Sequence, residues 1–333
     1  MRIPDPPFAG WQPPSYTVST DGKVSDAEPG TPNNWGRWGD DDQIGTANLS
    51  TADAVRDAAS LITSGRRFSL AVPIGTNVPS FRPVPLHLFG SAAADGVVAD
   101  AQPVGDGTRD RWAYSDDILV LAPQYSTQLD GFGLAVNDTM YNGYWAGLVT
   151  AHSGARRLGM HHRTAGIVGR GVLLDVARHI AGPASPLPHR FRISTALLEE
   201  TAAAQGVEVR PGDVLLVRTG YLAEALGGGD LAVEAAPGLA ASTIPWLHER
   251  DIMLVGTDTP TIEVVGEPEP GHSPNEFHFR ALRDLGLQLA ETLTLDELAA
   301  DCQADGRYEF FFAAAPLPVT GGVGSPLNPL AIK

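Results

Sequence analysis

The chain has 333 residues, of which 43% are hydrophobic, so it is long enough to bury a substantial core. Its 39 acidic and 23 basic side chains give a net charge of -16, which disfavours nucleic-acid and membrane-surface partners and favours a small-molecule substrate. The single cysteine, Cys302, excludes an intrachain disulfide and a cysteine-rich zinc site. The N-terminal stretch MRIPDPPFAGWQPPSY lacks the apolar core of a signal peptide, and no window approaches the roughly 18 apolar residues of a membrane span, so we expect a cytoplasmic protein.

The first third of the chain predicts an N-terminal arm, a helix and several strands. Residues 1–34 are rich in Pro, Gly, Ser and Asn without periodicity, which predicts an extended arm lying on the body or on a neighbouring subunit. TANLSTADAVRDAASLITSGRR predicts a helix that begins after Ser50 or Thr51 and ends at Gly65, and FSLAVPI predicts a strand. Residues 79–110 predict a long surface excursion, and the following DDILVLAPQ is typical of a buried strand.

The rest of the chain alternates strands and helices. SGARRLGMHHRTAGIVGRG predicts a short helix and a turn before the apolar strand GVLLDVA, and STALLEETAAAQG predicts a helix capped by Ser194 or Thr195 and ended by Gly206. DVLLVRTG, IMLVGTD and YEFFFAAAPL predict strands, whereas TIPWLHERD, FHFRALRDLGLQLAE and LDELAADCQADG predict helices. Because the alternation lacks the regular spacing of a barrel, residues 35–333 are predicted to form one α/β catalytic domain with a mixed sheet.

Two acidic residues and one histidine are candidate catalytic groups. Asp130 follows the predicted buried strand, where flanking glycines let the backbone approach a ligand, although an Asx-turn is the simpler alternative. His278 begins a predicted helix, and Glu291 follows thirteen residues later. A straight helix would separate these two by roughly 20 Å. If both serve one site, the segment RDLG must break the helix and return the chain as a strand.

Five long segments spread over nearly the whole chain carry a resemblance to a known family. They are WGRWGDDDQIGTANLST, AGIVGRGVLLDVAR, RPGDVLLVRTG, PWLHERDIMLVGTDTP and ADGRYEFFFAAAPLPVTGGVGSPLNPLAIK. In this order they resemble the cyclase family that includes bacterial kynurenine formamidase and isatin hydrolase, in particular its longer actinobacterial and fungal members. The resemblance implies a swivelling β/β/α domain with a mixed sheet, assembled as a homodimer or homotetramer.

The family motif His-x-Gly-Thr-His-x-Asp-x-Pro-x-His is present in a degenerate form. Ser126 and Thr127 take the Gly-Thr place, Gln128 stands for the second His, Asp130 matches the Asp, and Leu134 stands for the third His. In the family the second His, the Asp and the third His hold one or two divalent metals. Leu134 is a departure from this pattern, because a leucine has no lone pair to offer. We expect Gln128 and Leu134 to contact the substrate.

The resemblance also implies roles for residues outside the central part of the motif. A later His and an acidic residue that complete the family's metal site correspond to His278 and Glu291. A proton-shuttling His of some members falls on Asp138, which is therefore a candidate catalytic residue. Tyr141 and Asn142 match the long members and are expected to line the substrate pocket.

Whether a metal is bound is open from the sequence. Asp130, His278 and Glu291, with the Gln128 amide oxygen, would suit Mn or Mg better than Zn. The alternative is that no metal is bound and that Leu134 makes the pocket more apolar. In that case a carboxylate or His278 acquires a shifted pKa suited to general acid and base work.

Three functional hypotheses follow. The first is an enzyme acting at an amide, lactone or cyclic imide carbonyl of a small organic molecule, in hydrolysis or ring closure. The second is a metal-independent acid/base cyclase, dehydratase or lyase in a specialised biosynthetic pathway. The third is a catalytically silent binding protein, against which the polar site residues argue, because an idle pocket has no need of buried charge.

Overall fold

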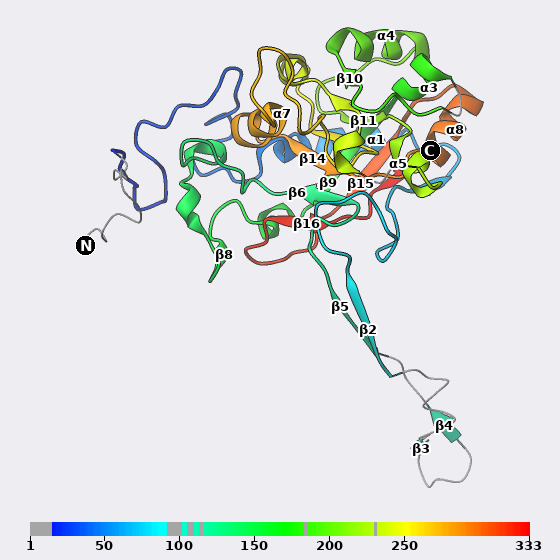
Figure 1. Cartoon of the computed structure of the whole chain (residues 1–333), viewed down its shortest axis with the longest axis horizontal. Helices are drawn as coiled ribbons and strands as arrows, with labels where there is room; N and C mark the ends of the chain where they lie inside the picture. The colour runs from blue at the N-terminus through cyan, green and yellow to red at the C-terminus, as the bar shows by residue number, and fades with distance from the viewer. Residues whose placement is uncertain (1–14, 92–101, 105–109, 113–115, 183–184, 230–231) are drawn as a thin grey trace.

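The computed structural model describes residues 15–91, 102–104, 110–112, 116–182, 185–229 and 232–333. Its centre is a nine-stranded mixed sheet in the order β1-β17-β15-β9-β11-β13-β14-β6-β16 (Figure 1). Along the chain these strands are β1 (Arg67–Ser69), β6 (Gln128–Asp130), β9 (Ile167–Asp175), β11 (Val214–Arg218), β13 (Leu254–Thr257), β14 (Gln288–Glu291), β15 (Glu309–Ala314), β16 (Gly324–Pro326) and β17 (Leu330–Ile332). The run β9-β11-β13-β14 is parallel, and the other neighbouring pairs are antiparallel.

Short ribbons and helices surround this sheet. The two-stranded ribbons are β2 (Leu86–Ser91) with β5 (Asp116–Val120), β3 (Gln102–Val104) with β4 (Asp110–Trp112), β7 (Val149–Thr150) with β8 (Gly154–Ala155), and β10 (Arg192–Ile193) with β12 (Gly238–Leu239). The α-helices are α1 (Ala52–Ala59), α3 (Val176–Ala181), α4 (Thr195–Gln205), α5 (Tyr221–Leu226), α6 (Ile244–Glu249), α7 (Glu276–His278) and α8 (Asp296–Asp305). The 3-10 turns are η1 (Gly45–Leu49), η2 (Tyr141–Gly143), η3 (Ala146–Leu148), η4 (Met160–Arg163), η5 (Val233–Ala235) and η6 (Ala241–Thr243), and η7 (Phe279–Leu285) is π-helical.

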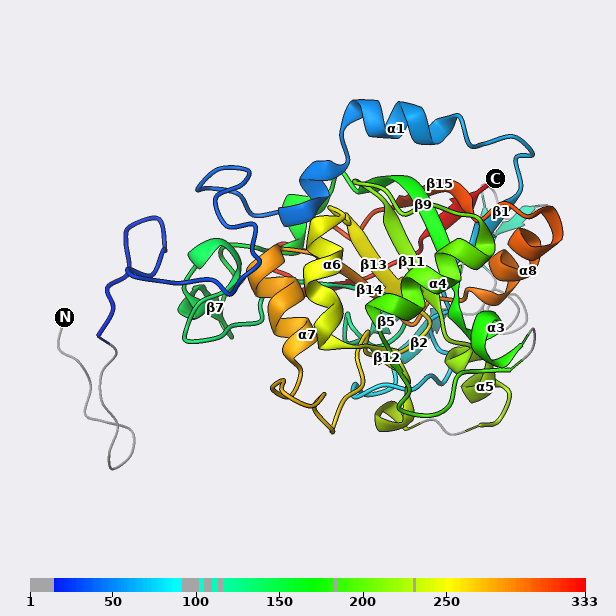
Figure 2. The same cartoon turned by 90° about the horizontal axis from the view of Figure 1, so that it is seen from above.

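The central strands are buried on both faces, which explains their continuous apolar sequences. On β9, Val172 and Leu174 pack into one core with side chains of α4, α6 and η7. Leu173, between them, packs into a second core with side chains of α8 and β15. Figure 2 shows α4, α6 and α7 over one face of the sheet. The result is the single mixed α/β domain that the sequence predicts.

Local capping rules account for the helix boundaries. Helix α4 begins at Ser194, whose side chain accepts a hydrogen bond from the backbone N–H of Leu197, and it ends at Gly206 with a φ of 66°. Both ends agree with the prediction. Helix α1 begins after Thr51 as predicted, but its last residue is Ala59, well before Gly65. Beyond Ala59 the chain forms turns, and Ile62 there is exposed.

The prediction of a buried strand at DDILVLAPQ is wrong. Strand β5 pairs with β2 in a ribbon that projects from the sheet, and all five of its residues are exposed (Figure 1). A short apolar run is equally compatible with a core strand and with a ribbon strand, so its periodicity cannot separate the two. The predicted surface excursion, 79–110, contains this ribbon's other strand, and its positions 92–101 and 105–109 lie outside the described residues.

Residues 15–34 of the predicted arm lie along the body. Arg283 Nη2 donates to the carbonyl of Glu28 at 2.8 Å, and Asn34 Nδ2 donates to the carbonyl of Leu285 at 2.9 Å. Residues 1–14 of the predicted arm lie outside the described residues. Within the described ranges, none of the helices combines the length and the apolar character needed to cross a membrane.

Candidate active site

Strands β6 and β14 place three polar side chains on one face of the sheet. Gln128 and Asp130 are two residues apart, so the two-residue period of a strand points them to the same side. The antiparallel register sets Gln128 opposite Glu291, the last residue of β14. The intervening Leu129 and Ala290 face the apolar core on the other side. The alternation of the two strands therefore gathers an amide and two carboxylates at one place.

His278 is delivered by the segment that precedes β14. The chain forms α7 and η7, and then Gly286, with a φ of 57°, turns it back into β14. A Cβ at position 286 would meet the Tyr141 ring at 2.5 Å, so this turn requires glycine. The predicted break at RDLG is thus present, and it brings His278 to Glu291 across a separation of 13 residues. A π-helical stretch is itself a frequent companion of functional sites.

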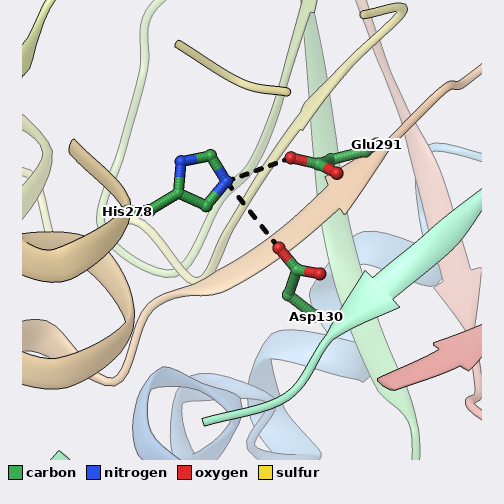
Figure 3. A group of neighbouring side chains, drawn as sticks. All are labelled: Asp130, His278 and Glu291. Atoms are coloured by element: carbon green, nitrogen blue, oxygen red, sulfur yellow. Dashed lines mark hydrogen bonds and ion pairs between the residues drawn. The ribbon is translucent and has the colours of Figure 1, made fainter. Parts of the chain in front are cut away.

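One nitrogen of the His278 imidazole faces both carboxylates (Figure 3). Its Nε2 is 3.1 Å from Glu291 Oε1 and 3.8 Å from Asp130 Oδ2. These three atoms all lie within 4.8 Å of one another. Two carboxylates and one imidazole therefore converge on a single point.

Glu263 holds the other side of the imidazole. Its Oε1 lies 2.6 Å from His278 Nδ1 and also accepts from the backbone N–H of His278 at 3.0 Å. With the Nδ1 proton directed at Glu263, a neutral imidazole presents the lone pair of Nε2 to Asp130 and Glu291. A charged imidazolium instead donates from both nitrogens. The first state suits a bound cation, and the second suits proton transfer.

Two glutamine amides orient the carboxylates. Gln124 Nε2 donates to Asp130 Oδ1 at 2.7 Å, and Gln128 Nε2 donates to Glu291 Oε2 at 2.6 Å. The backbone N–H of Ile262 donates to Glu291 Oε1 at 3.2 Å. Gln128 Oε1 is buried without a protein partner in the described part of the chain. Because an unpaired buried acceptor costs about 1–3 kcal/mol, this oxygen is a candidate contact for a bound molecule.

Burial shifts the ionisation of all three converging groups. It raises the pKa of Glu291 to about 7, and the adjacent Asp130 carboxylate adds to this rise. Burial also raises the pKa of Asp130, although His278 opposes the shift. Burial disfavours the charged imidazole of His278, yet hydrogen bonds to Glu263 and Glu291 outweigh it and hold the pKa well above its usual value. A cluster that holds protons near neutral pH has the property that general acid–base catalysis requires.

The cluster lies in the wall of a cavity of about 410 Å³. Most of the remaining lining is apolar and comes from Pro79, Phe81, Tyr125, Leu134, Val149, Pro260, Leu282 and Val323. A mainly apolar cavity with a few convergent polar groups is the usual form of a small-molecule site.

Gln128 and Leu134 line this cavity, whereas Tyr141 and Asn142 are not among its lining residues. Tyr141 is fully buried, and its hydroxyl donates to Asp42 Oδ2 at 2.8 Å. The Asn142 side-chain amide donates to the backbone carbonyls of Gly39 and Asp42, at 3.2 Å each. The expectation that these two residues line the pocket is wrong, because both anchor the loop before η1.

Asp138 also lies apart from the cavity. Its carboxylate is exposed and accepts a hydrogen bond from the Tyr16 hydroxyl at 3.0 Å. Asp138 has a positive φ of 59°, and its backbone carbonyl accepts from the N–H of Ala146. The loop therefore turns this side chain toward the N-terminal arm, and the assignment of Asp138 as a proton shuttle is not supported by its position.

Sequence reasoning missed three residues that belong to the site. Glu263 lies 15 residues before His278 in a segment without regular structure, and its role depends on the path of the chain. Gln124 precedes β6 and contacts Asp130 only because the chain turns there. Arg82 lines the cavity from the segment before β2. No spacing or periodicity marks these positions, although the acidic character of Glu263 in TIEVVGE is a weak signal.

The donor set fits a divalent cation. Asp130, His278 and Glu291 offer two carboxylate oxygens and an imidazole nitrogen, and Glu263 fixes the orientation of the imidazole through its other nitrogen, as carboxylates next to metal-binding histidines commonly do. Three protein ligands with further positions left open are typical of catalytic metal sites. Leu134 supplies no donor, so the set is rich in oxygen and matches Mn or Mg better than Zn.

Comparisons with known proteins identify the family of this chain. Residues 68–264, more than half of the chain, match the family described as "Putative cyclase". A kynurenine formamidase from Bacillus cereus (strain ATCC 10987 / NRS 248) is 32% identical over 95 residues, which cover 28% of this chain and 39% of that protein. The matched part thus spans well under two thirds of that relative's length.

Solved structures extend the comparison to most of the chain. One described as a novel cyclase is 39% identical, covers 90% of this chain and 97% of its own, and superposes with a TM-score of 0.82. An isatin hydrolase bound to the product analogue thioisatinate shares the fold at 19% identity, with a TM-score of 0.54 over 84% of this chain and 98% of that one. The chain therefore belongs to the cyclase family.

Proposed function

We propose that the protein is a hydrolase acting at an amide, lactone or cyclic imide carbonyl of a small organic molecule, or closing such a ring in the reverse direction. The observation that carries this proposal is the convergence of Asp130, His278 and Glu291 in the wall of a mostly apolar cavity. The names of two compared proteins, kynurenine formamidase and isatin hydrolase, support the same reaction class.

Each side chain of the site would have its own role in such a reaction. Glu263 accepts the Nδ1 proton of His278, so the Nε2 lone pair is directed at Asp130 and Glu291, where it would help to hold a cation; without a cation, the same nitrogen accepts or returns a proton. The amides of Gln124 and Gln128 keep the carboxylates aimed at that point. A divalent cation held by Asp130, His278 and Glu291 would polarise the substrate carbonyl and lower the pKa of the attacking water. The apolar lining holds the rest of the substrate and excludes bulk water.

A panel of aryl formamides, lactones and cyclic imides tests this proposal. The purified protein, supplied with Mn²⁺ or Zn²⁺, is incubated with each compound, and mass spectrometry follows the gain of one water. We expect conversion of at least one class, with a rate about 10²–10⁴-fold lower for Glu291→Gln, because that variant keeps the shape but loses the carboxylate. No conversion anywhere in the panel, or an equal rate in the variant, would refute the proposal.

A second candidate is a metal-independent acid/base cyclase, dehydratase or lyase. The observation that favours it is Leu134, which lines the cavity where the family motif carries an imidazole, together with the pKa of Glu291 near 7. In this case the His278 imidazolium donates a proton and the Glu291 carboxylate accepts one.

Chelation separates the two candidates. Turnover that is lost after exhaustive dialysis against a chelator and returns with Mn²⁺ supports the metal-assisted hydrolase. Turnover that survives chelation, in protein shown by elemental analysis to be metal-free, supports the acid/base enzyme. In either case His278→Ala should be inactive.

A further inference from the structure

Arg163, the last residue of η4, carries a positive charge in the interior of the protein. The residue is only 2% exposed. Within the described part of the chain, its guanidinium makes no ion pair with a carboxylate. Because a buried charge is costly and normally has a charged partner, this arginine requires an explanation.

Hydrogen bonding alone does not explain a guanidinium at this position. Arg163 Nη1 donates to the backbone carbonyl of Asp130 at 2.9 Å and to Gln288 Oε1 at 3.1 Å, and both of these acceptors are neutral. Arg163 Nε and Nη2 are buried without a partner among the described residues, and the guanidinium carbon lies 3.8 Å from the centre of the Phe132 ring. A neutral amide could serve the two acceptors at a lower desolvation cost. The feature that only an arginine supplies here is the charge.

The charge of Arg163 acts mainly on Asp130. Burial lowers the pKa of Arg163 to about 9, although Asp130 and then Asp42 oppose the shift, so the group remains charged at neutral pH. The Asp42 carboxylate already accepts a hydrogen bond from the Tyr141 hydroxyl. Asp130 is the nearer carboxylate in its effect, and it belongs to the cluster with His278.

Arg163 approaches Asp130 from behind β6. Its hydrogen bond goes to the backbone of Asp130, whereas the carboxylate of Asp130 contacts Gln124 and His278. Arg163 is not among the described residues that line the cavity, so its charge acts through the protein and not by contact with a bound molecule. A direct ion pair would occupy the carboxylate oxygens, but a charge behind the strand leaves them free. The interior screens such a charge much less than water does.

We propose that Arg163 is a positioning residue that sets the charge around the cation site, so that the cluster holds a divalent ion less tightly than its donor atoms alone would. This inference rests on the proposed function, in which Asp130, His278 and Glu291 hold a cation. Those two carboxylates and Glu263 surround a single imidazole and attract a cation strongly. The fixed charge of Arg163 offsets part of this attraction. A bound ion that is less neutralised by its surroundings polarises a carbonyl more strongly.

Calorimetric titration of Mn²⁺ into the full chain, after dialysis against a chelator, tests the proposal. We expect Arg163→Gln, which loses the charge but keeps an amide donor, to bind Mn²⁺ about 10-fold or more tightly than the wild type. Arg163→Lys keeps the charge and should bind Mn²⁺ as the wild type does. Arg67→Gln is the matched control, because it removes the same charge from an exposed position on β1, and its affinity should not change. Circular dichroism verifies that each variant is folded.

The sign of the change separates this proposal from a purely structural role. If Arg163 only held β6 in place, its loss would loosen the ligands, so weaker or unchanged Mn²⁺ binding by folded Arg163→Gln would overturn the proposal. Equal tightening in Arg163→Lys or Arg67→Gln would overturn it too, as would Mn²⁺ binding too weak to detect in all of these proteins. If Arg163→Gln does not fold, Arg163→Met, which keeps the side-chain volume beside Phe132, takes its place in the same titration.

Turnover provides a second readout, which depends on the proposed function. On any substrate that the wild type converts, we expect kcat of Arg163→Gln saturated with Mn²⁺ to fall about 10-fold, because the ion then polarises the carbonyl less. An unchanged kcat would overturn the link to carbonyl activation. If the wild type converts no substrate, the proposed function fails, and the Mn²⁺ affinities still decide whether Arg163 sets the charge around the site.

Discussion

Two clusters of buried charge lie at carboxyl ends of parallel strands in the same sheet, and they differ in how the charge is balanced. At the end of β9 and β11, Arg218 lies 2.8 Å from Asp175 and 2.7 Å from Asp296, and Arg178 lies 3.3 Å from Asp175. Two arginines thus balance two aspartates. We call this group the balanced cluster.

At the end of β14 the buried carboxylates outnumber their ion-pair partners. Among the described residues, the carboxylates of Asp130, Glu263 and Glu291 have one imidazole, His278, as their ion-pair partner. We call these four residues the unbalanced cluster. A cavity of about 560 Å³ also borders the balanced cluster, so a cavity alone does not separate the two regions. Unpaired buried charge, which folding alone does not favour, is therefore the stronger sign of function.

The largest effect should come from neutralising the unbalanced cluster. We expect Asp130→Asn to reduce kcat/KM by about 10²–10⁴-fold, because the variant keeps the shape and removes a reacting carboxylate. Its free energy of unfolding should not fall, since the change removes a buried charge that lacks a full partner. Kinetics and urea unfolding of the same preparation check both parts. A variant that loses stability while keeping turnover would reverse the roles we assign to the two clusters.

The balanced cluster should show the opposite pattern. We expect Arg218→Met to lower the free energy of unfolding by about 3 kcal/mol, because it leaves the buried Asp175 with a weakened set of partners. Turnover by the folded variant should stay close to that of the wild type. Urea denaturation measures the first part, and steady-state kinetics below the transition measures the second. A catalytic defect without a loss of stability would show that this cluster is part of the active site.

A smaller effect, on metal affinity alone, is expected from a substitution beside the unbalanced cluster. Leu134→His adds an imidazole to the cavity lining, so we expect the variant to bind Mn²⁺ or Zn²⁺ more tightly than the wild type. Titration calorimetry and elemental analysis measure the gain, with Leu282→His as a control that places the same group elsewhere in the lining. Equal affinity in Leu134→His and the wild type would mean that position 134 does not face the metal-binding atoms.

The smallest expected effect concerns the thiol of Cys302, in helix α8. Burial raises the pKa of its thiol to about 12, so at pH 8 almost all of it stays protonated and unreactive in the folded protein. We expect a thiol reagent at pH 8 to label Cys302 only after unfolding, because the unfolded thiol has the ordinary pKa of about 8.5. Rapid labelling of the native protein at pH 8 would show that α8 opens locally.

The sequence predicts those parts of the fold that depend on neighbouring residues. The cap at Ser194 and the stop at Gly206 are local signals, and both appear in the structure. The turn after η7 also follows from sequence, because only a break brings His278 and Glu291 into one site. The exposure of β5 does not follow, since an apolar run does not record whether a sheet or solvent lies next to it.

The residues of the candidate site, too, could be predicted only in part from the sequence. Asp130, His278 and Glu291 come together as the family resemblance implies. Glu263 and Gln124 were missed because their contacts depend on the three-dimensional path of irregular segments. Tyr141 and Asn142 match the family in sequence, yet their side chains are used to anchor a loop. Similarity at a position therefore identifies a residue that matters without identifying its role.

Two histidine variants can decide whether the unbalanced cluster is the catalytic centre. We would measure turnover of His278→Ala and His162→Ala, on whichever carbonyl substrate the wild type converts, after circular dichroism has shown that both are folded. We expect His278→Ala to lose at least about 10²-fold in rate, because its Nε2 faces both carboxylates. We expect His162→Ala, whose side chain is exposed away from the cavity, to keep the wild-type rate. Equal rates for the two variants would contradict the account.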